Sequence, residues 1–255
     1  MANEIYNSSY WGNGVCDNAI DWGVVYKDFA GCTPSFSNTY SISFDGVDDY
    51  INTGTNSLIG ASTLTISAWF KSSDVDSQYL LGDNSVRFSI KQSNGDTRIF
   101  FTGSTDPFRG FGIPYNVGEW NNIILTFDGS LVQADRLKLY HNGVEINNIN
   151  AGTPNTTLLL NVAGSFMIGR AGSTSINPWN GNIDEVAYWN SVQNVATIYN
   201  SGTPADLTSL SPLSWWRNGD PNGQASYPTI TDDGSASNDG TMTNQIATDI
   251  ETDVP

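Results

Sequence analysis

The sequence predicts an all-β protein built as one main sandwich with an extension at each end. Along several short segments, apolar residues alternate with polar ones, which is the pattern of strands with one buried face. Charged residues make up 14% of the chain, against a usual share of about 25%, so Asn, Ser, Thr and Gly supply much of the polar surface. The 255 residues could hold two average domains, yet sandwiches of roughly 200 to 250 residues are routinely single domains.

The stretch Tyr40–Gly54 is predicted to form a strand, an acidic turn and a second strand. Ile42 and Phe44 alternate with serines, which places both apolar side chains on one buried face. Gly46 gives the backbone the freedom that a tight turn needs. Three carboxylates fall within five residues at this turn, on Asp45, Asp48 and Asp49. Such a turn suits a cation that prefers oxygen ligands.

This stretch also resembles a known family. The segment SFDGVDDY is similar to a signature of the laminin-G-like members of the concanavalin A-like lectin/glucanase superfamily. Five further blocks follow in family order: LTISAWFK, VGEWNNIILTFDG, LKLYHNGVE, FMIGRAG and WNGNIDEVAYWN. Together the blocks span roughly residues 40–202. The resemblance implies a two-sheet antiparallel jelly-roll sandwich, often with one structural calcium ion, and a binding role more often than catalysis.

The resemblance also implies a fourth metal ligand. Family members tend to hold the aspartate of the NIDEVAYW segment, here Asp184, near the acidic turn. If so, Asp184 and the turn's Asp45, Asp48 or Asp49 would supply carboxylate oxygens to Ca²⁺, completed by backbone carbonyls and water. The alternative is that Asp184 accepts backbone N–H groups and fixes the turn.

Residues 1–39 lie outside the resemblance and are expected to form an N-terminal arm. Their aromatic residues indicate packing on the sandwich or on a partner chain, because disordered tails are poor in such residues. The chain's two cysteines, Cys16 and Cys32, lie here and could close a disulfide loop or remain as two buried thiols. A zinc site is not expected, because the sole histidine, His141, is far away in sequence.

Residues 203–255 are predicted to complete the sandwich. The segments PLSWWRNGD (Pro212–Asp220) and TITDDGSASNDGTMTN (Thr229–Asn244) look like an element that in many relatives precedes the SFDGVDDY strand. They either fill that place in their own sheet or exchange with a neighbouring subunit, and the first is favoured because an unpaired edge promotes aggregation. The closing TDIETDVP is expected to be a loose tail.

A loop rich in Gly and Pro, Ser104–Tyr115, is the candidate ligand-binding segment. It contains Phe108, Arg109, Phe111 and Tyr115, and aromatic residues with an arginine are what sugar or protein recognition uses. The alternative is that these aromatic side chains cover the edge of the sandwich.

The charge balance argues against two classes of partner. Acidic residues number 26 against 10 basic ones, so the net charge of −16 repels nucleic acid and anionic lipid.

No run approaches the roughly 18 apolar residues of a membrane helix, so membrane insertion is not expected. The first ten residues lack a basic and an apolar region, so export by a Sec signal peptide is not expected either.

Catalysis is not expected. Glycoside hydrolysis generally needs two facing carboxylates, and the E-x-D-x-E strand pattern of laminarinase-like enzymes is absent. Asp184 and Glu185 are adjacent on a predicted strand, so they should point to opposite faces.

Two function classes remain. The first is a virion surface component, a capsid decoration or fibre protein that also adheres to glycan, because the chain resembles lectin-like proteins of marine phages; its partners would be other virion proteins or copies of itself. The second is a free or cell-surface module that binds polysaccharide in a calcium-dependent way. Both place the protein on a virion surface or outside the cell.

Overall fold

The structure is a computed structural model that describes residues 36–54, 60–83, 88–93, 96–101, 108–111, 115–147, 149–150, 156–157, 165–172 and 177–255. The sandwich is the compact unit Asn38–Pro255. Cys16 and Cys32, and nearly all of the expected N-terminal arm, lie outside the described residues.

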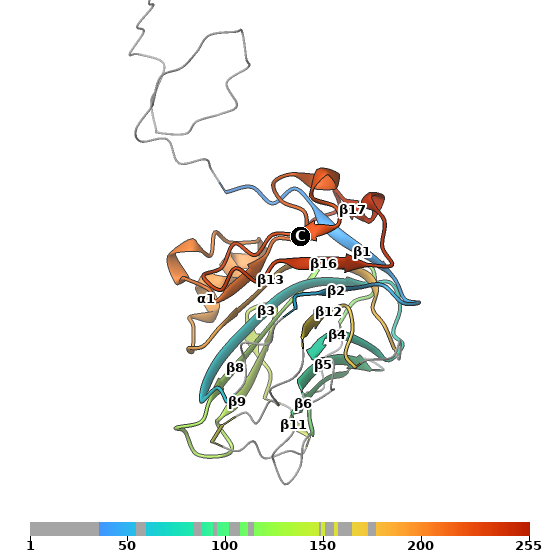
Figure 1. Cartoon of the computed structure of the whole chain (residues 1–255). Coiled ribbons are helices and arrows are strands. Elements are labelled where there is room, and N and C mark those ends of the chain that lie inside the picture. Colours follow the sequence, from blue (N-terminus) through green and yellow to red (C-terminus); the bar gives the residue numbers. More distant parts are fainter. Residues whose placement is uncertain are drawn as a thin grey trace, which may run out of the picture. The chain divides into compact units, whose positions relative to one another are not determined.

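Two antiparallel sheets form this unit, which confirms the all-β sandwich (Figure 1). Sheet 1 has the order β10-β9-β8-β3-β13-β1-β17, with β14 also pairing β13. Its strands are β1 (Ser41–Asp45), β3 (Thr63–Ser72), β8 (Asn121–Asp128), β9 (Leu137–His141), β10 (Val144–Glu145), β13 (Asn180–Trp189), β14 (Ser214–Trp216) and β17 (Ile250–Glu251).

Sheet 2 has the order β11-β7-β6-β5-β4-β12-β2-β16-β15. Its strands are β2 (Tyr50–Asn52), β4 (Gln78–Asp83), β5 (Phe88–Ser93), β6 (Asp96–Phe101), β7 (Phe108–Phe111), β11 (Ile149–Asn150), β12 (Phe166–Ile168), β15 (Thr229–Ile230) and β16 (Gly240–Thr243). The predicted strand–turn–strand at residues 40–54 therefore links the sheets, because β1 lies in sheet 1 and β2 in sheet 2.

The core lies between the two sheets and follows the alternation of the sequence. Leu64, Ile66 and Phe70 of β3 are buried on the face that meets sheet 2. Phe70 packs edge-on against Trp179, with ring centroids 5.5 Å apart and planes at 88°. Burying aromatic rings of this size contributes about 3 kcal/mol or more for each, so this contact is a substantial part of the core.

The C-terminal residues supply strands to both sheets. β16 pairs with β2, while β14 pairs with β13 and β17 with β1. Trp216 of β14 is fully buried and stacks on Phe166 of β12, with ring centroids 5.6 Å apart and planes at 11°. The last strands of the chain are thus part of the core rather than an appendage.

The closing residues are not the loose tail that the sequence predicted. Ile250 pairs with Ile42, and the Ser41 hydroxyl donates to the Asp253 carbonyl at 2.6 Å. Lys71 forms an ion pair with the Asp253 carboxylate, to which the Trp120 indole also donates. Apart from the core residue Ile250, these anchors are polar, so the segment carries no apolar periodicity from which its pairing could have been predicted.

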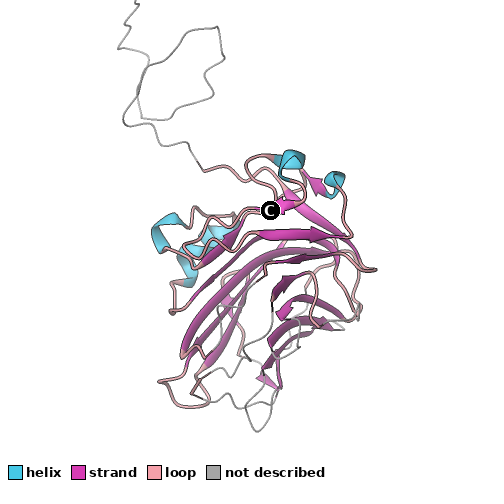
Figure 2. Ribbon diagram, in the orientation of Figure 1, coloured by secondary structure: helices cyan, strands magenta, loops and turns pink. Residues whose placement is uncertain are grey.

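The helical segments are short and all of those described follow β13 (Figure 2). They are α1 (Val195–Tyr199) and four 3₁₀ turns, Asn200–Gly202, Thr208–Leu210, Gly223–Ser226 and Ala247–Asp249. Asn194 caps α1 by accepting from the Thr197 N–H at 3.2 Å. No helix among the described residues is long and apolar enough to cross a membrane.

Candidate functional site

The acidic turn gathers its three carboxylates. Asp45, Asp48 and Asp49 each place an oxygen within 4.8 Å of the others. Asp45 accepts from the Val47 N–H at 2.8 Å, and Asp49 accepts from the Asp45 N–H at 3.0 Å. Gly46 adopts φ +76°, which a tight turn of this kind requires. Backbone N–H groups of the turn therefore hold the carboxylates of Asp45 and Asp49 in place.

Mutual repulsion and burial act on this cluster. The pKa of Asp49 is raised to about 6, and burial is the largest cause. The hydrogen bond from the Asp45 N–H opposes this shift, whereas the charges of Asp45, Asp249 and Asp48 add to it. Three carboxylates are hard oxygen ligands of the type that Ca²⁺ takes, and they would supply part of its six to eight oxygens. The donor set fits a calcium ion.

Asp184 does not join this cluster. Asp45 pairs with Asn180 of β13, and Asp184 lies four residues further along that strand, which at about 3.3 Å per residue is about 13 Å away. Its carboxylate accepts instead from the Asn38 side-chain amide at 2.8 Å and from the Glu185 N–H at 2.7 Å. The four predicted metal ligands are therefore split between two places.

A β-bulge explains where Asp184 and Glu185 point. Ile183 and Val186 are both buried in the core, although an uninterrupted strand would send them to opposite faces. The register with β3 shifts between Asp184 and Ala187, and Glu185 adopts φ +48°. The bulge therefore turns Asp184 and Glu185 to the outer face together, so the prediction of opposite faces is wrong.

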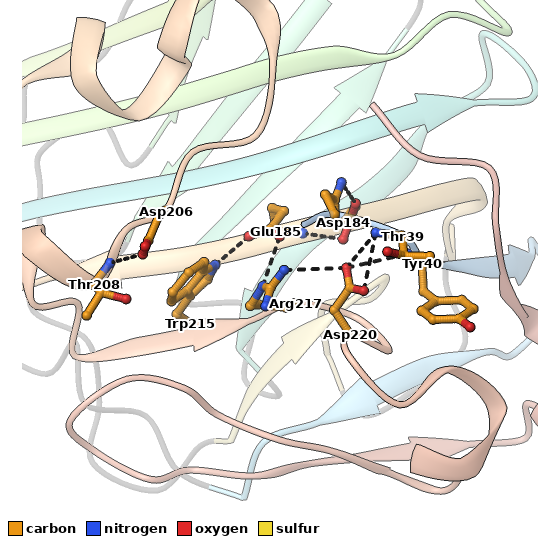
Figure 3. A network of polar contacts seen from close by, with 10 residues as sticks. Thr39, Tyr40, Asp184, Glu185, Asp206, Thr208, Trp215, Arg217 and Asp220 are labelled. Carbon is orange, nitrogen blue, oxygen red and sulfur yellow. Dashed lines mark hydrogen bonds and ion pairs between the residues drawn. The ribbon is translucent and has the colours of Figure 1, made fainter. Parts of the chain in front are cut away.

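Arg217 lies between the acidic residues of a buried polar network on this outer face (Figure 3). Its guanidinium lies 3.3 Å from Glu185 and 3.6 Å from Asp220. The Trp215 indole N–H donates to Glu185. Asp220 also accepts from the backbone N–H of Thr39 at 2.9 Å. The network thus joins the start of the sandwich, its central strand and the C-terminal segment.

Negative charge exceeds positive charge in this network. Asp184, Glu185 and Asp220 are each at most 8% exposed. Burial and the charge of Glu185 raise the pKa of Asp184 well above its usual range. Burial raises the pKa of Glu185 to about 7, against the opposing influence of Arg217. Burial likewise raises the pKa of Asp220. Protons therefore remain on part of this group near neutral pH.

A groove of about 550 Å³ lies next to the network, within the range of small-ligand sites. Side-chain amides, hydroxyls, one carboxylate and one aromatic ring face it. It is lined by Tyr40, Asn222, Gln224, Ala225, Thr248, Ile250, Glu251 and Thr252. A second groove of about 230 Å³ lies over β8 and β9, beside Tyr140 and Gln193.

The network positions one wall of the larger groove. Asp220 accepts from the Tyr40 N–H at 3.4 Å and from the neighbouring Thr39 N–H. The Tyr40 ring lies against Gly223, where an added Cβ would come within 2.6 Å of it. Because a side chain at position 223 would collide with the ring, the placement of Tyr40 depends on close packing against the 3₁₀ turn Gly223–Ser226 as well as on the network.

The predicted ligand-binding residues lie in other places. Phe108, Arg109 and Phe111 belong to β7, and their side chains lie outside the described part of the structure. Tyr115 is 7% exposed, packs edge-on against Phe70 and donates its hydroxyl to the Asp74 carbonyl at 3.2 Å. Tyr115 thus has no free face for a ligand, and it fits the alternative in which these aromatics cover the edge of the sandwich.

Sequence reasoning missed the larger groove and the Arg217 network. One signal was available, because PLSWWRNGD places Arg217 and Asp220 among tryptophans, in a segment already recognised as displaced. A charged pair within an aromatic segment indicates a buried ion pair. The partner of Arg217, Glu185, could not be identified without knowledge of the bulge. The groove could not be predicted because Tyr40 lies about 180 residues away in sequence from the residues of its other wall.

The fold is that of a lectin-like β-sandwich, and comparison with known proteins agrees. Residues 45–199 match the family described as the concanavalin A-like lectin/glucanases superfamily, and the chain belongs to it. This confirms the family that the sequence blocks indicated. A comparison with curated proteins finds no match.

Three solved structures share this fold. A proposed carbohydrate-binding protein from Bacteroides ovatus has a TM-score of 0.60 at 15% identity, covering 87% of this chain and 64% of that one. The CBM40 of the Ruminococcus gnavus IT-sialidase, bound to α2,3-sialyllactose, has a TM-score of 0.51 at 16% identity, covering 63% and 94%. A native heptameric SAP-like pentraxin from Limulus polyphemus has a TM-score of 0.50 at 18% identity, covering 64% and 82%. At these identities the likeness concerns the fold alone.

Proposed function

We propose that this protein is a non-catalytic carbohydrate-binding module that acts outside the cell. The observation that carries the proposal is the groove beside Tyr40, on a fold shared with carbohydrate-binding proteins. Sugar recognition uses a small number of placed polar groups together with an apolar surface. Asn222 and Gln224 offer amide donors and acceptors, and Glu251 offers a carboxylate acceptor. Tyr40 offers a ring against which a pyranose can lie.

The absence of catalysis is part of this proposal. Glu251 is the one acid among the residues that line the groove, whereas glycoside hydrolysis generally uses two carboxylates about 5 to 9.5 Å apart. Asp184 and Glu185 do lie together, but they are 0% and 3% exposed, so a substrate cannot reach them. Burial is the main cause of both raised pKa values; the charge of Glu185 adds to the pKa of Asp184, and the charge of Asp220 adds to that of Glu185.

Binding to a glycan array, followed by variants of the groove, tests the proposal. Gln224→Ala and Asn222→Ala should each weaken binding several-fold, because each removes a side chain that can bond sugar hydroxyls. Asn116→Ala is the matched control, since Asn116 is an exposed amide that bonds Glu119 in another part of the sandwich. The proposal fails if no glycan binds, or if the control weakens binding as much as the groove variants do.

We further propose that Ca²⁺ binds at the acidic turn and acts structurally. Asp45, Asp48 and Asp49 would be its carboxylate ligands, and Asp184 would not take part, because it lies in the Arg217 network. The turn already contacts the C-terminal segment, since the Asn244 amide donates to the Asp48 carbonyl at 3.0 Å. Calcium would therefore stabilise this junction rather than contact the glycan.

Thermal unfolding with Ca²⁺ and with chelator tests the metal proposal. Ca²⁺ at 100 times its Kd should add about 2.7 kcal/mol to the free energy of unfolding. Asp49→Asn and Asp45→Asn should remove this increment, whereas Asp184→Asn should keep it. Identical melting with Ca²⁺ and with chelator would exclude the site.

A virion surface role, as capsid decoration or fibre, is a second candidate. It is supported by the aromatic residues of segment 1–39, which suit contacts with other virion proteins or with further copies of this chain. The mass of the native protein tests it. A stable trimer or larger assembly that is lost on removing residues 1–37, which precede the sandwich unit, would favour it, and a monomer would contradict it.

A further inference from the structure

The carboxylate that lines the larger groove is held in place by neutral groups. Glu251 lies on β17 and pairs with Ser41 of β1. Asn182 of β13, which is 7% exposed, donates from its side-chain amide to the Glu251 carboxylate at 3.2 Å and to the Ser41 hydroxyl at 3.1 Å. The Ser41 hydroxyl in turn donates to the Asp253 carbonyl. These hydrogen bonds fix the position of the carboxylate without neutralising its charge.

Glu251 keeps its negative charge available to a ligand. Among the described residues, the Asn182 amide is the side-chain group that bonds the Glu251 carboxylate, and no ion pair between those residues includes it. Two cations near it in the structure already have acidic partners, since Lys71 pairs with Asp253 and Arg217 pairs with two buried carboxylates. Glu251 is also exposed, so a ligand in the groove can reach it.

The other residues that line the groove add no positive charge. They are uncharged side chains, four of them polar: Asn222, Gln224, Thr248, Thr252, Tyr40, Ala225 and Ile250. The whole chain carries a net charge of −16. A cleft lined by one sign of charge concentrates ligands of the opposite sign. The groove therefore attracts cationic ligands and repels sugars that carry a carboxylate.

We infer that the groove selects amino sugars whose nitrogen is positively charged, and that Glu251 is the residue that selects them. The inference rests on the proposed function and names the ligand class of the same groove. The sugar ammonium would donate a charge-assisted hydrogen bond to the Glu251 carboxylate, which is roughly twice as strong as a bond between neutral groups. An acylated nitrogen carries no positive charge, so an N-acetylated sugar would lose this contribution.

The neutral groups of the groove fit the rest of such a sugar. The side-chain amides of Asn222 and Gln224 can both donate to and accept from ring hydroxyls. The Tyr40 ring can lie against the apolar face of the sugar. Because these contacts do not depend on the charge of the ligand, a neutral sugar with the same ring should also bind, but more weakly. Glu251 thus sets the specificity, and the neutral residues set the general affinity.

Calorimetric titration of the full chain with a glucosamine oligosaccharide and with its fully N-acetylated counterpart tests the inference. At a pH where the amine is protonated, the glucosamine form should bind about tenfold more tightly, because it adds a hydrogen bond between charged groups. Glu251→Gln keeps the shape of the side chain and an acceptor for the Asn182 amide. It should weaken binding of the glucosamine form about tenfold and leave the N-acetylated form unchanged.

Glu145→Gln is the matched control. It removes one negative charge from an exposed side chain on β10, which lies at the opposite edge of sheet 1 from β17. The net charge of the protein therefore changes equally in both variants. Glu145→Gln should leave the binding of both oligosaccharides unchanged.

Different outcomes would overturn the inference and the proposed function. Equal affinity for the two forms, or tighter binding of the N-acetylated form, would overturn the inference alone, since a neutral sugar would still bind. Equal losses in Glu251→Gln and Glu145→Gln would also overturn it, because the effect would be one of net charge. A preference for glucosamine that survives Glu251→Gln would do the same. If neither form nor any other glycan binds, the proposed function fails and the inference fails with it.

Discussion

Replacing Arg217 with methionine perturbs the network that joins the C-terminal segment to the central strand. The change keeps much of the side-chain volume and removes the positive charge. Arg217 lies 3.3 Å from Glu185 and 3.6 Å from Asp220, and these three side chains are 13%, 3% and 1% exposed. At an effective dielectric constant of about 20, each pair contributes roughly 5 kcal/mol of Coulomb energy before desolvation is subtracted.

The net cost of Arg217→Met should be about 3–5 kcal/mol, which is typical of breaking a buried pair by removing one partner. It should be largest at alkaline pH, where two buried carboxylates would have to stay ionised without a counter-charge. Near pH 5.5 they can take up protons, because their pKa values are already raised and removing Arg217 raises them further. The cost should then fall.

Urea unfolding, monitored by tryptophan fluorescence at pH 8 and at pH 5.5, measures this difference. A loss of about 3–5 kcal/mol corresponds to a decrease in Tm of roughly 6–20 °C. Lys138→Met is the control, since the Lys138–Glu145 pair is exposed and contributes at most about 1 kcal/mol. A loss for Arg217→Met no larger than the control's, or one that is the same at both pH values, would refute the reasoning.

Two further predictions concern stability. The pKa of the Glu185 carboxyl is about 7 in the folded protein, against an ordinary value of 4.5, so the folded state holds the carboxyl proton more tightly than the unfolded state does. The free energy of unfolding should therefore fall by up to about 3 kcal/mol as pH rises from 4.5 through about 7. Glu185→Gln should flatten that slope in pH-dependent unfolding, and an unchanged slope would contradict the assignment. A chain ending at Gly202 loses the buried Trp216, Ile230, Met242 and Ile250, so it should show no cooperative melting, whereas melting at the full chain's temperature would contradict the account.

Much of the fold could be predicted because its signals are local. The alternation of Leu64, Ile66 and Phe70 sets the buried face of β3, and Asp45 with Gly46 sets the turn between the sheets. The two sheets were expected from the family resemblance of the blocks that contain these residues. Each of these features is determined by residues within a few positions of one another.

The candidate sites were harder to predict because they depend on distant segments and on one local irregularity. The bulge at Glu185 turns two adjacent acids to the same face, and strand alternation alone predicts the opposite. The groove joins Tyr40 to residues near 222 and 250.

Hydrogen exchange of the full chain with and without a glycan identified on the array tests the central claim most directly. The account predicts slower exchange on binding in the segments that line the groove, near Tyr40, around Asn222–Ala225 and around Thr248–Thr252. Because binding at a single groove orders those backbone segments together, they should be protected with the same dependence on glycan concentration. Saturable glycan binding that leaves these segments unchanged and protects the smaller groove near Tyr140 instead would contradict it.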